Sequence, residues 1–333
     1  MKLGIVGSGM IVREFLPKLV KLDGLEVVGV QGTPRSKEQT RELCAANGVA
    51  NAASSFEELT ALDIDTVYIA VPNFLHFMYC KRALEAGLNV IVEKPIASNF
   101  NEAEELGRLA RRTGRFLFEA VTTLYFDGFQ KIKEWIGRIG AVKIAHCNYS
   151  QYSSRYDAFR AGALPPVFDP AKSGGALMDL NLYNLHFIMG LFGKPESAVY
   201  YANIERHIDT SGTMILRYPG FVAACTAAKD CSAPYSFVIE GTNGYITTQY
   251  PPNFIGEVKI YLNNKTEEIY NDGMAMDRVI PEFRFFMDCI KRNDLKFCFD
   301  RLNESIAVSE IQTKARLDAG IIFAADQKAL PEA

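Results

Sequence analysis

Two short stretches of the sequence combine residue types that could contact a reacting hydroxyl group and move its proton. Lys94 follows an apolar run, and Asp179 and Tyr183 stand four residues apart in a second apolar run. A spacing of four places two side chains on one face of a helix. Tyrosine can act as a general acid or base when a neighbouring cation stabilises its phenolate form. Lys94, Tyr183 and Asp179 are therefore the candidate catalytic residues.

Each of these residues also has an ordinary explanation. A lone lysine is usually solvated, an aspartate near a helix start is favoured by the helix dipole, and a tyrosine can simply fill a core. The residues around Asp179 and Tyr183 are nearly all apolar, so we expect this helix, predicted over Ala176–Phe192, to be buried. Because a buried carboxylate requires a partner or a raised pKa, Asp179 is expected to be paired or functional.

A glycine-containing turn suggests a second kind of chemistry, the binding of a phosphate group. Gly7 and Gly9 follow a strand-like run and precede a helix-like run, which is the context that a dinucleotide-binding loop requires. Glycines let the backbone approach a pyrophosphate, and N–H groups at the helix start, including those of Met10 and Ile11, stabilise its charge. Val12 replaces the usual third glycine. We expect cofactor binding here; the alternative is an ordinary strand–helix turn.

The residues after the second expected strand bear on the choice between NAD and NADP. An acidic residue at this place would bind the ribose 2′-hydroxyl of NAD, but the first carboxylate here is Glu38. Arg35 and the hydroxyl groups of Thr33 and Ser36 could bind a 2′-phosphate instead. The sequence therefore favours NADP, with NAD still possible and with a solvated Arg35 as the alternative interpretation.

The elements that must position these residues fall into two regions. Strand-like and helix-like runs alternate through residues 1–120, which predicts βαβ units and a doubly wound parallel sheet, the Rossmann arrangement. Residues 121–333 contain mostly strand-like runs separated by turns, one long apolar helix and two final helices near 275–292 and 303–325. The expected fold class is α/β, with an N-terminal Rossmann domain and a C-terminal α+β domain whose sheet is mostly antiparallel.

Composition excludes several classes of protein. The chain has 333 residues, 48% hydrophobic residues and a net charge of −3, as expected for a globular protein without a nucleic-acid-binding surface. No apolar stretch is long enough for a transmembrane helix, and no signal peptide is recognisable. The seven cysteines form no C-x-x-C pair and no two histidines stand at i, i+4, so we expect no metal site and a cytoplasmic location.

The three motifs that contain the glycine turn, Lys94 and Tyr183, together with two further ones, occur in the order typical of one family. They are the Gly-x-Gly turn, Val71-Pro72-Asn73 with His76, Glu93-Lys94-Pro95, Glu119-Ala120, and Gly174-Gly175-Ala176 with Asp179 and Tyr183. Over essentially its whole length the chain resembles the Gfo/Idh/MocA oxidoreductase family. The stretch from Phe168 to Tyr183 is most similar to the branch of dimeric dihydrodiol dehydrogenase and glucose–fructose oxidoreductase.

This resemblance implies roles for individual residues. Lys94 would contact the reacting hydroxyl and the nicotinamide ribose, its bond to Pro95 would be cis, Tyr183 would be the general acid/base, and Asp179 would orient the substrate or tune the pair. The remaining residues implied to line the cofactor cleft are Pro72, Asn73, His76 and Glu93. His76 could equally be a helix-start histidine with its hydrogen bonds satisfied. The resemblance also implies that the second domain's sheet is open and supports a homodimer or homotetramer.

The reaction implied is hydride transfer between nicotinamide and a secondary alcohol of a sugar, a cyclic polyol or a trans-dihydrodiol. Tyr152, Arg155 and Tyr156 could supply substrate-recognising groups, although an exposed loop after a strand would look the same. Asn181 stands where the branch usually has glycine and could narrow the pocket. Two alternatives remain: a non-catalytic NAD(P)-binding sensor, and a reductase of a non-sugar carbonyl or imine.

Overall fold

The computed structural model describes residues 1–271 and 277–327, which form two compact units. The first unit contains Met1–Ala120 together with Val279–Ile306, and the second contains Val121–Arg278 and the chain from Ala307 onward. We had expected one boundary near residue 120 and all later residues in the second domain. That assignment is wrong for Val279–Ile306, because aromatic residues of this segment pack in the first unit: Phe283 contacts Tyr68 and Phe286 stacks on Phe118.

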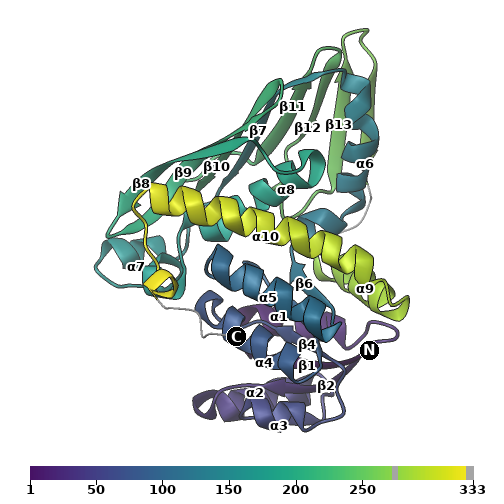
Figure 1. Cartoon of the computed structure of the whole chain (residues 1–333), viewed down its shortest axis with the longest axis vertical. Coiled ribbons are helices and arrows are strands. Elements are labelled where there is room, and N and C mark those ends of the chain that lie inside the picture. Colours follow the sequence, from purple (N-terminus) through teal and green to yellow (C-terminus); the bar gives the residue numbers. More distant parts are fainter. Residues whose placement is uncertain (272–276, 328–333) are drawn as a thin grey trace. The chain divides into compact units, whose positions relative to one another are not determined.

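The first unit is built on a six-stranded parallel sheet in the order β3-β2-β1-β4-β5-β6 (Figure 1). The strands are β1 (Lys2–Val6), β2 (Glu26–Gln31), β3 (Asn51–Ala53), β4 (Thr66–Ile69), β5 (Asn89–Glu93) and β6 (Leu117–Ala120). The helices are α1 (Met10–Leu19), α2 (Lys37–Ala46), α3 (Phe56–Thr60), α4 (His76–Glu85), α5 (Phe100–Thr113), α9 (Val279–Lys291) and the first part of α10 (Leu295–Asp318).

Local sequence explains most of these elements. The central strands β1 and β4 are buried on both faces, as expected for apolar strands covered by helices. The Asn99 side chain caps α5 by accepting a hydrogen bond from the Glu102 N–H, and Gly114 ends that helix in the left-handed conformation. The expected Rossmann arrangement is confirmed. Strand β3 and helix α3 were not predicted, since each is no longer than five residues.

The second unit contains an eight-stranded sheet in the order β14-β13-β12-β11-β7-β10-β9-β8. Only the central pair β7 and β10 is parallel, so the expected mostly antiparallel sheet is confirmed. The strands are β7 (Val142–Ser150), β8 (Ser197–Glu205), β9 (Ile208–Tyr218), β10 (Phe221–Ala228), β11 (Ser236–Gly241), β12 (Gly244–Thr248), β13 (Glu257–Leu262) and β14 (Glu267–Asn271).

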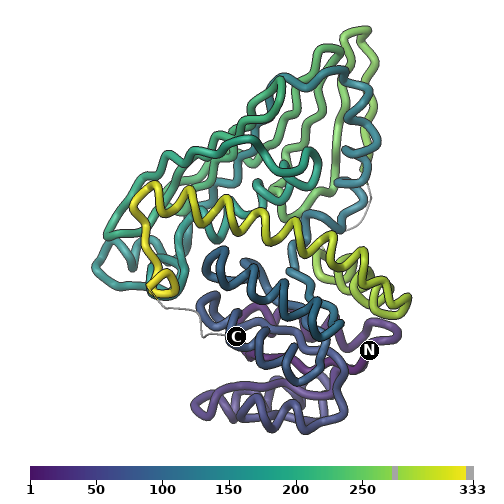
Figure 2. The backbone as a smooth tube through the Cα atoms, in the orientation of Figure 1, coloured from purple at the N-terminus to yellow at the C-terminus, as the bar shows by residue number. Residues whose placement is uncertain are grey.

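Helices cover one face of this second sheet (Figure 1). They are α6 (Asp127–Trp135), α8 (Leu182–Phe192) and the later part of α10, and a short helix, α7 (Tyr156–Arg160), follows β7. Figure 2 traces α10 as one continuous helix; it begins and ends earlier than the helix predicted over residues 303–325. The other late helix, predicted near residues 275–292, corresponds to α9. Residues 275 and 276 of the predicted range lie outside the described residues.

The long apolar helix predicted over Ala176–Phe192 consists of two parts. Leu177–Asn181 forms a π-helical turn, and α8 continues from Leu182. Such turns are rare and often occur at functional sites. This one carries Asp179, and α8 carries Tyr183 in its first turn. The expectation that this segment is buried is confirmed, because nearly all of its residues have little exposed surface.

Candidate active site

The cofactor-binding residues predicted at the first strand lie on an exposed turn at the carboxyl end of β1. Gly7 has φ +117°, and a side chain there would collide with the Ala70 carbonyl oxygen. Gly9, the residue that precedes α1, has no heavy atom within 4 Å of the position that a Cβ would occupy. Helix α1 has no side-chain cap and no acidic residue in its first turn. Its first N–H groups, from Met10 and Ile11 onward, therefore suit a phosphate group.

The residues predicted to select NADP form a tight turn after β2. Thr33 and Ser36 cap each other: the Thr33 N–H donates to Ser36 Oγ at 2.9 Å and the Ser36 N–H donates to Thr33 Oγ1 at 3.2 Å. Arg35 lies between them and is exposed. The strand itself ends in Gln31, which is buried and donates from Nε2 to the Tyr79 hydroxyl oxygen at 3.4 Å. No carboxylate occupies the end of β2, and a basic side chain stands beside two hydroxyl groups.

His76 begins α4 and is fully buried. Its Nδ1 lies 2.7 Å from the Pro95 carbonyl oxygen, and its Nε2 lies 2.8 Å from the Val71 carbonyl oxygen. Burial lowers the pKa of His76, although these two carbonyl groups and Glu119 oppose the change. The ring therefore joins the loop after β4 to the turn after β5. A neutral imidazole has one N–H group, so it can donate to only one of these two carbonyl oxygens. The predicted place of His76 in the cofactor cleft remains a prediction, with a helix-start histidine as the alternative.

Lys94 directly follows β5, and its peptide bond to Pro95 is cis, as predicted. The preceding Glu93 accepts a hydrogen bond from the Tyr68 hydroxyl group, and both Glu93 and Lys94 are half-buried. Because β1 and β5 are parallel strands of one sheet, Lys94 and the Gly7–Gly9 turn lie at the same edge of that sheet. Ligands of doubly wound sheets bind at this edge.

Pro72 and Asn73 lie in the loop that follows β4, at the same edge of the sheet. Pro72 is exposed and Asn73 is half-buried. The loop is held to the rest of the unit through His76, which begins the next helix. Their predicted contact with a cofactor remains a prediction.

In the second unit, the helix start before Asp179 is held by a buried carboxylate. Asp209 Oδ2 accepts hydrogen bonds from the Leu177 N–H at 2.6 Å and from the Tyr200 hydroxyl group at 2.8 Å. Gly175 has φ +103°, and any Cβ there would collide with Asp209 Oδ1. Burial raises the pKa of Asp209 to about 6, against the opposing effect of these hydrogen bonds and of Lys229. The Gly174-Gly175 motif thus makes room for the carboxylate.

Asp179 is ion-paired, as one of the two sequence interpretations required. Its partner is Lys229, the residue directly after β10, whose ammonium group donates to Asp179 Oδ2. The Lys229 side chain is 5% exposed, whereas that of Asp179 is 27% exposed. The ammonium group also lies 5.7 Å from the centre of the Phe168 ring. The pair therefore joins a buried cation to a carboxylate that still reaches the surface.

Tyr183 lies in an aromatic group formed by three elements. Its ring centre is 5.8 Å from that of Tyr149 on β7, and Tyr149 in turn lies 5.6 Å from Tyr235, just before β11. Tyr183 is 7% exposed. The ring is thus fixed by packing on the sheet.

The three predicted substrate-binding residues follow β7 and differ in exposure. Tyr152 and Arg155 are exposed, and the Tyr152 hydroxyl group donates to Asp157 Oδ1 at 2.7 Å. Tyr156 is buried and donates to Glu205 Oε1 at 2.6 Å, a hydrogen bond that raises its pKa to about 12. Its ring lies 5.6 Å from that of Tyr152 and 5.8 Å from that of Phe168. Through Phe168, this group borders the Lys229–Asp179 pair.

Sequence reasoning missed Lys229 and Asp209 and misjudged Asn181. Lys229 is the first cation after the apolar β10, and Asp209 is the only acidic residue inside β9; these positions were the available clues. The side chain of Asn181 is fully buried and donates to the Cys225 carbonyl oxygen at 2.9 Å. Asn181 therefore braces the helix against β10 and does not narrow a pocket.

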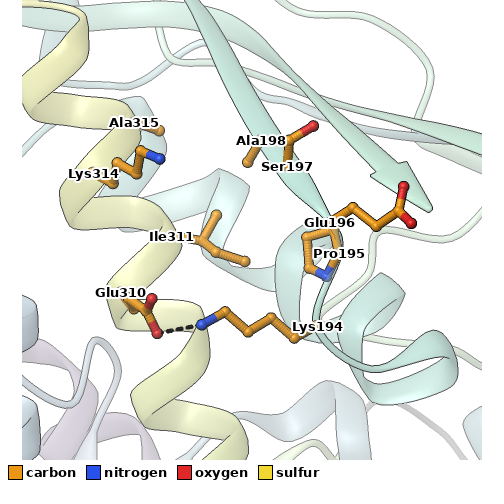
Figure 3. A pocket seen from close by; sticks show the side chains of 9 residues that line it. All are labelled: Lys194, Pro195, Glu196, Ser197, Ala198, Glu310, Ile311, Lys314 and Ala315. Carbon is orange, nitrogen blue, oxygen red and sulfur yellow. Dashed lines mark hydrogen bonds and ion pairs between the residues drawn. The ribbon is translucent and has the colours of Figure 1, made fainter. Parts of the chain in front are cut away.

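A surface pocket of about 230 Å³ occurs elsewhere in the second unit (Figure 3). It is lined by Lys194, Pro195, Glu196, Ser197, Ala198, Glu310, Ile311, Lys314 and Ala315. The Lys194 ammonium group and Glu310 Oε2, 2.6 Å apart, close one side, and Ile311 lies at its centre. None of the candidate catalytic residues lines this pocket, so it carries no argument about the reaction.

Two kinds of feature are absent from the described residues, 1–271 and 277–327. No group of three or more His, Cys, Asp or Glu side chains is arranged to hold a metal ion there. No described helix is long and apolar enough to cross a membrane.

Comparison with protein families identifies the chain. Residues 1–121 match the oxidoreductase family with an NAD-binding Rossmann fold, Gfo/Idh/MocA, and residues 129–247 match the Gfo/Idh/MocA C-terminal domain. The chain belongs to the Gfo/Idh/MocA oxidoreductase family. The resemblance stated from its motifs is thereby confirmed.

The relatives that match the chain over nearly its full length include the following two. It is 33% identical over 337 residues to the scyllo-inositol 2-dehydrogenase (NADP(+)) IolU of Bacillus subtilis (strain 168), covering 98% of this chain and 99% of that protein. It is 26% identical to the trans-1,2-dihydrobenzene-1,2-diol dehydrogenase of Mus musculus, covering 98% of both.

Solved structures support the same fold. A 3-ketoreductase from Actinomadura kijaniata in complex with NADP and TDP-benzene superimposes with a TM-score of 0.81 at 20% identity, covering 95% of this chain and 97% of that chain. A levoglucosan dehydrogenase in complex with NADH and levoglucosan gives 0.78 at 18% identity, covering 95% and 98%. At these identities the comparisons establish the fold alone.

Proposed function

We propose that this oxidoreductase is an NADP-preferring dehydrogenase or reductase acting on a secondary alcohol of a sugar, a cyclic polyol or a trans-dihydrodiol. One observation carries the proposal: the glycine turn with its open Gly9, the uncapped start of α1 and Lys94 lie at the same carboxyl edge of one parallel sheet. A dinucleotide bound along this edge would have its pyrophosphate at the helix start. The substrate classes come from the names of the full-length relatives.

In the proposed reaction, bound nicotinamide cofactor would accept or supply the hydride. Tyr183 takes the hydroxyl proton during oxidation and returns it during reduction. Lys94 hydrogen-bonds the reacting oxygen, as the family resemblance implies. Asp179 orients the substrate or tunes Tyr183. Tyr152, Arg155 and Tyr156 would then contact more distant hydroxyl groups or the face of the ring.

The proposed NADP preference depends on Arg35. A charged hydrogen bond contributes about 1.5–3 kcal/mol, so Arg35→Ala should weaken NADPH binding by about ten- to a hundredfold. NADH binding should change little, because NADH lacks the 2′-phosphate. Arg112→Ala, a matched change near the end of α5, is the control. Fluorescence titration of each variant with both cofactors is the measurement, and an equal loss for NADPH and NADH would remove Arg35 from this role.

Turnover tests the reaction itself. The purified protein would be incubated with NADP(+) and a panel of inositols, pyranoses and trans-dihydrodiols, with reduction followed at the nicotinamide absorbance. Reduction with at least one member is expected. Tight NADPH binding with no turnover on any of them, in either direction, would refute the dehydrogenase proposal and favour the sensor.

We further propose that the second unit forms a homodimer or homotetramer through its sheet. The ladder register places six large apolar residues on one face of that sheet: Ile144, Val199, Tyr201, Val222, Tyr245 and Ile269. All are exposed, Tyr201 by 68%. A sheet face with this many exposed apolar residues suits a second copy of the same chain. Light scattering of the wild type and of Val222→Glu should show an oligomer and a monomer, and a monomeric wild type would contradict the proposal.

A cytoplasmic location is part of the same proposal. All seven cysteines are free thiols, and six of them are buried. Free thiols persist most readily in a reducing compartment. Fractionation of cells that express the full chain is the measurement.

A further inference from the structure

Lys229 is a buried cation whose backbone is fixed by the second unit's sheet. Its N–H donates to the Thr210 carbonyl oxygen at 2.8 Å, and its own carbonyl oxygen accepts from the Ser153 N–H at 2.9 Å. Its side chain, 5% exposed, runs inward to Asp179 and the Phe168 ring. Because a buried ammonium group without a counter-charge is strongly unfavourable, the Asp179 carboxylate stabilises this placement.

Asp179 is therefore held from two directions. Lys229 binds its carboxylate, and Asp209 accepts from the Leu177 N–H, which fixes the backbone two residues earlier. The Lys229 charge also acts on Asp209 and lowers its pKa, against the larger effect of burial. Both contacts join residues more than 30 positions apart to the same helical turn. Within this arrangement Asp179 alone keeps substantial exposed surface, at 27% of its side chain.

We propose that Lys229 is a positioning residue of the reaction proposed above: it holds the Asp179 carboxylate in one direction, one helical turn before Tyr183. The inference rests on the proposed function. Without the ammonium group, the negative charge of Asp179 on the helix of Tyr183 would lose its ion-pair partner Lys229. That charge would disfavour the phenolate and leave the substrate less well oriented. Cofactor binding, which depends on the first unit's glycine turn, would be retained.

Four variants of the full chain test this role: Lys229→Met, Lys229→Arg, Asp179→Asn and the double change Lys229→Met with Asp179→Asn. Lys194→Met is the matched control, since Lys194 forms an exposed ion pair with Glu310 in the same unit. Thermal unfolding needs no substrate, so it tests the pair independently of the reaction. We expect Lys229→Met to lower the Tm by about 5–10 °C, because Asp179 loses its partner. Adding Asp179→Asn should restore part of this loss, and the double variant also remains useful if Lys229→Met fails to fold.

Kinetics then test the positioning role with a substrate that the wild type oxidises. Lys229→Met should lower kcat by about a hundredfold, as expected for a misplaced active-site group, and leave the Kd for NADPH unchanged. Lys229→Arg should recover most of the activity because it keeps the charge. In the Asp179→Asn background, Lys229→Met should lower kcat only slightly further, since its effect on kcat acts through Asp179. Lys194→Met should match the wild type.

Several outcomes would overturn the inference. Additive Tm changes would show that the two residues do not form a pair. A normal kcat for Lys229→Met, or an equal loss with and without Asp179, would exclude positioning through Asp179. A wild type without turnover on any polyol would refute the proposed function and this role with it, and the unfolding cycle would then still report whether the pair exists.

Discussion

The nucleotide end of the first unit and the Tyr183 region of the second are built in opposite ways. The first is a backbone site: an exposed glycine turn and a helix start without a side-chain cap. The second is a side-chain site in which Asp209 caps the helix, Lys229 binds Asp179 and Tyr183 packs on Tyr149. A backbone site tolerates changes nearby as long as the turn keeps its space. A buried side-chain site couples each of its members to the stability of the fold.

This contrast predicts how variants divide. Changes at the glycine turn that need no new space in the protein should weaken cofactor binding and leave stability intact. Changes around Tyr183 should leave cofactor binding intact and alter turnover, stability or both. The predictions below run from the largest expected effect to the smallest.

Tyr183→Phe removes one hydroxyl group and keeps the ring that packs on Tyr149. If Tyr183 is the general acid/base, kcat should fall by about 10²–10⁴-fold with little change in the Kd for NADPH. Tyr235→Phe, a matched change in the same aromatic group, should keep normal turnover. Steady-state kinetics and a fluorescence titration are the measurements. A kcat for Tyr183→Phe near that of the wild type would assign the proton transfer to another group.

Gly175→Ala and Gly9→Ala test the two kinds of glycine directly. At Gly175 the positive φ and the collision with Asp209 Oδ1 should together cost about 3–5 kcal/mol of unfolding free energy. At Gly9, where φ is −74° and the Cβ position is open, the protein should keep its stability and lose affinity for NADPH. Chemical denaturation and cofactor titration of both variants are the measurements. If Gly9→Ala unfolded the protein, the turn would be required by the fold and not by the cofactor.

The same contrast explains how much the sequence could predict. Adjacent residues define the glycine turn, the end of β2 and the Lys94–Pro95 turn, so local patterns were sufficient to identify them. Parallel and antiparallel sheets followed from the alternation of strands and helices. Very short elements such as β3 and α3 were missed, because a few residues show no periodicity.

The side-chain partners could not be predicted in this way. Asp179 was expected to be paired or functional, but its partner is 50 residues away and becomes visible only when β10 lies beside the helix. Asp209 was missed for the same reason, since it meets Leu177 across 32 residues. The assignment of α9 to the second domain failed because sequence order alone does not show which sheet covers the apolar face of a late helix. Asn181 shows that a residue type does not reveal which way its side chain points.

Asp209→Asn tests the buried carboxylate without removing its hydrogen-bond acceptor. The pKa of Asp209 is about 6 in the folded protein, and its ordinary value is 3.8. At pH values between these two pKa values, Asp209 is protonated in the folded state and ionised in the unfolded chain. The stability that the neutral form contributes to the folded state is therefore lost as the pH rises from about 4 to 6. Asparagine does not titrate and keeps an oxygen for the Leu177 N–H and the Tyr200 hydroxyl group.

The stability of Asp209→Asn relative to the wild type should therefore increase as the pH rises from 4 to 7. One pKa unit corresponds to about 1.4 kcal/mol, so the relative gain should reach about 2–3 kcal/mol. Denaturant unfolding of both proteins at several pH values gives this difference directly, and Asp157→Asn on the exposed helix α7 is a control that should show no such trend. Parallel pH profiles would mean that the helix start tolerates a charged Asp209. The Tyr183 region would then be held in place by the Lys229–Asp179 pair and by aromatic packing rather than by the Asp209 carboxylate.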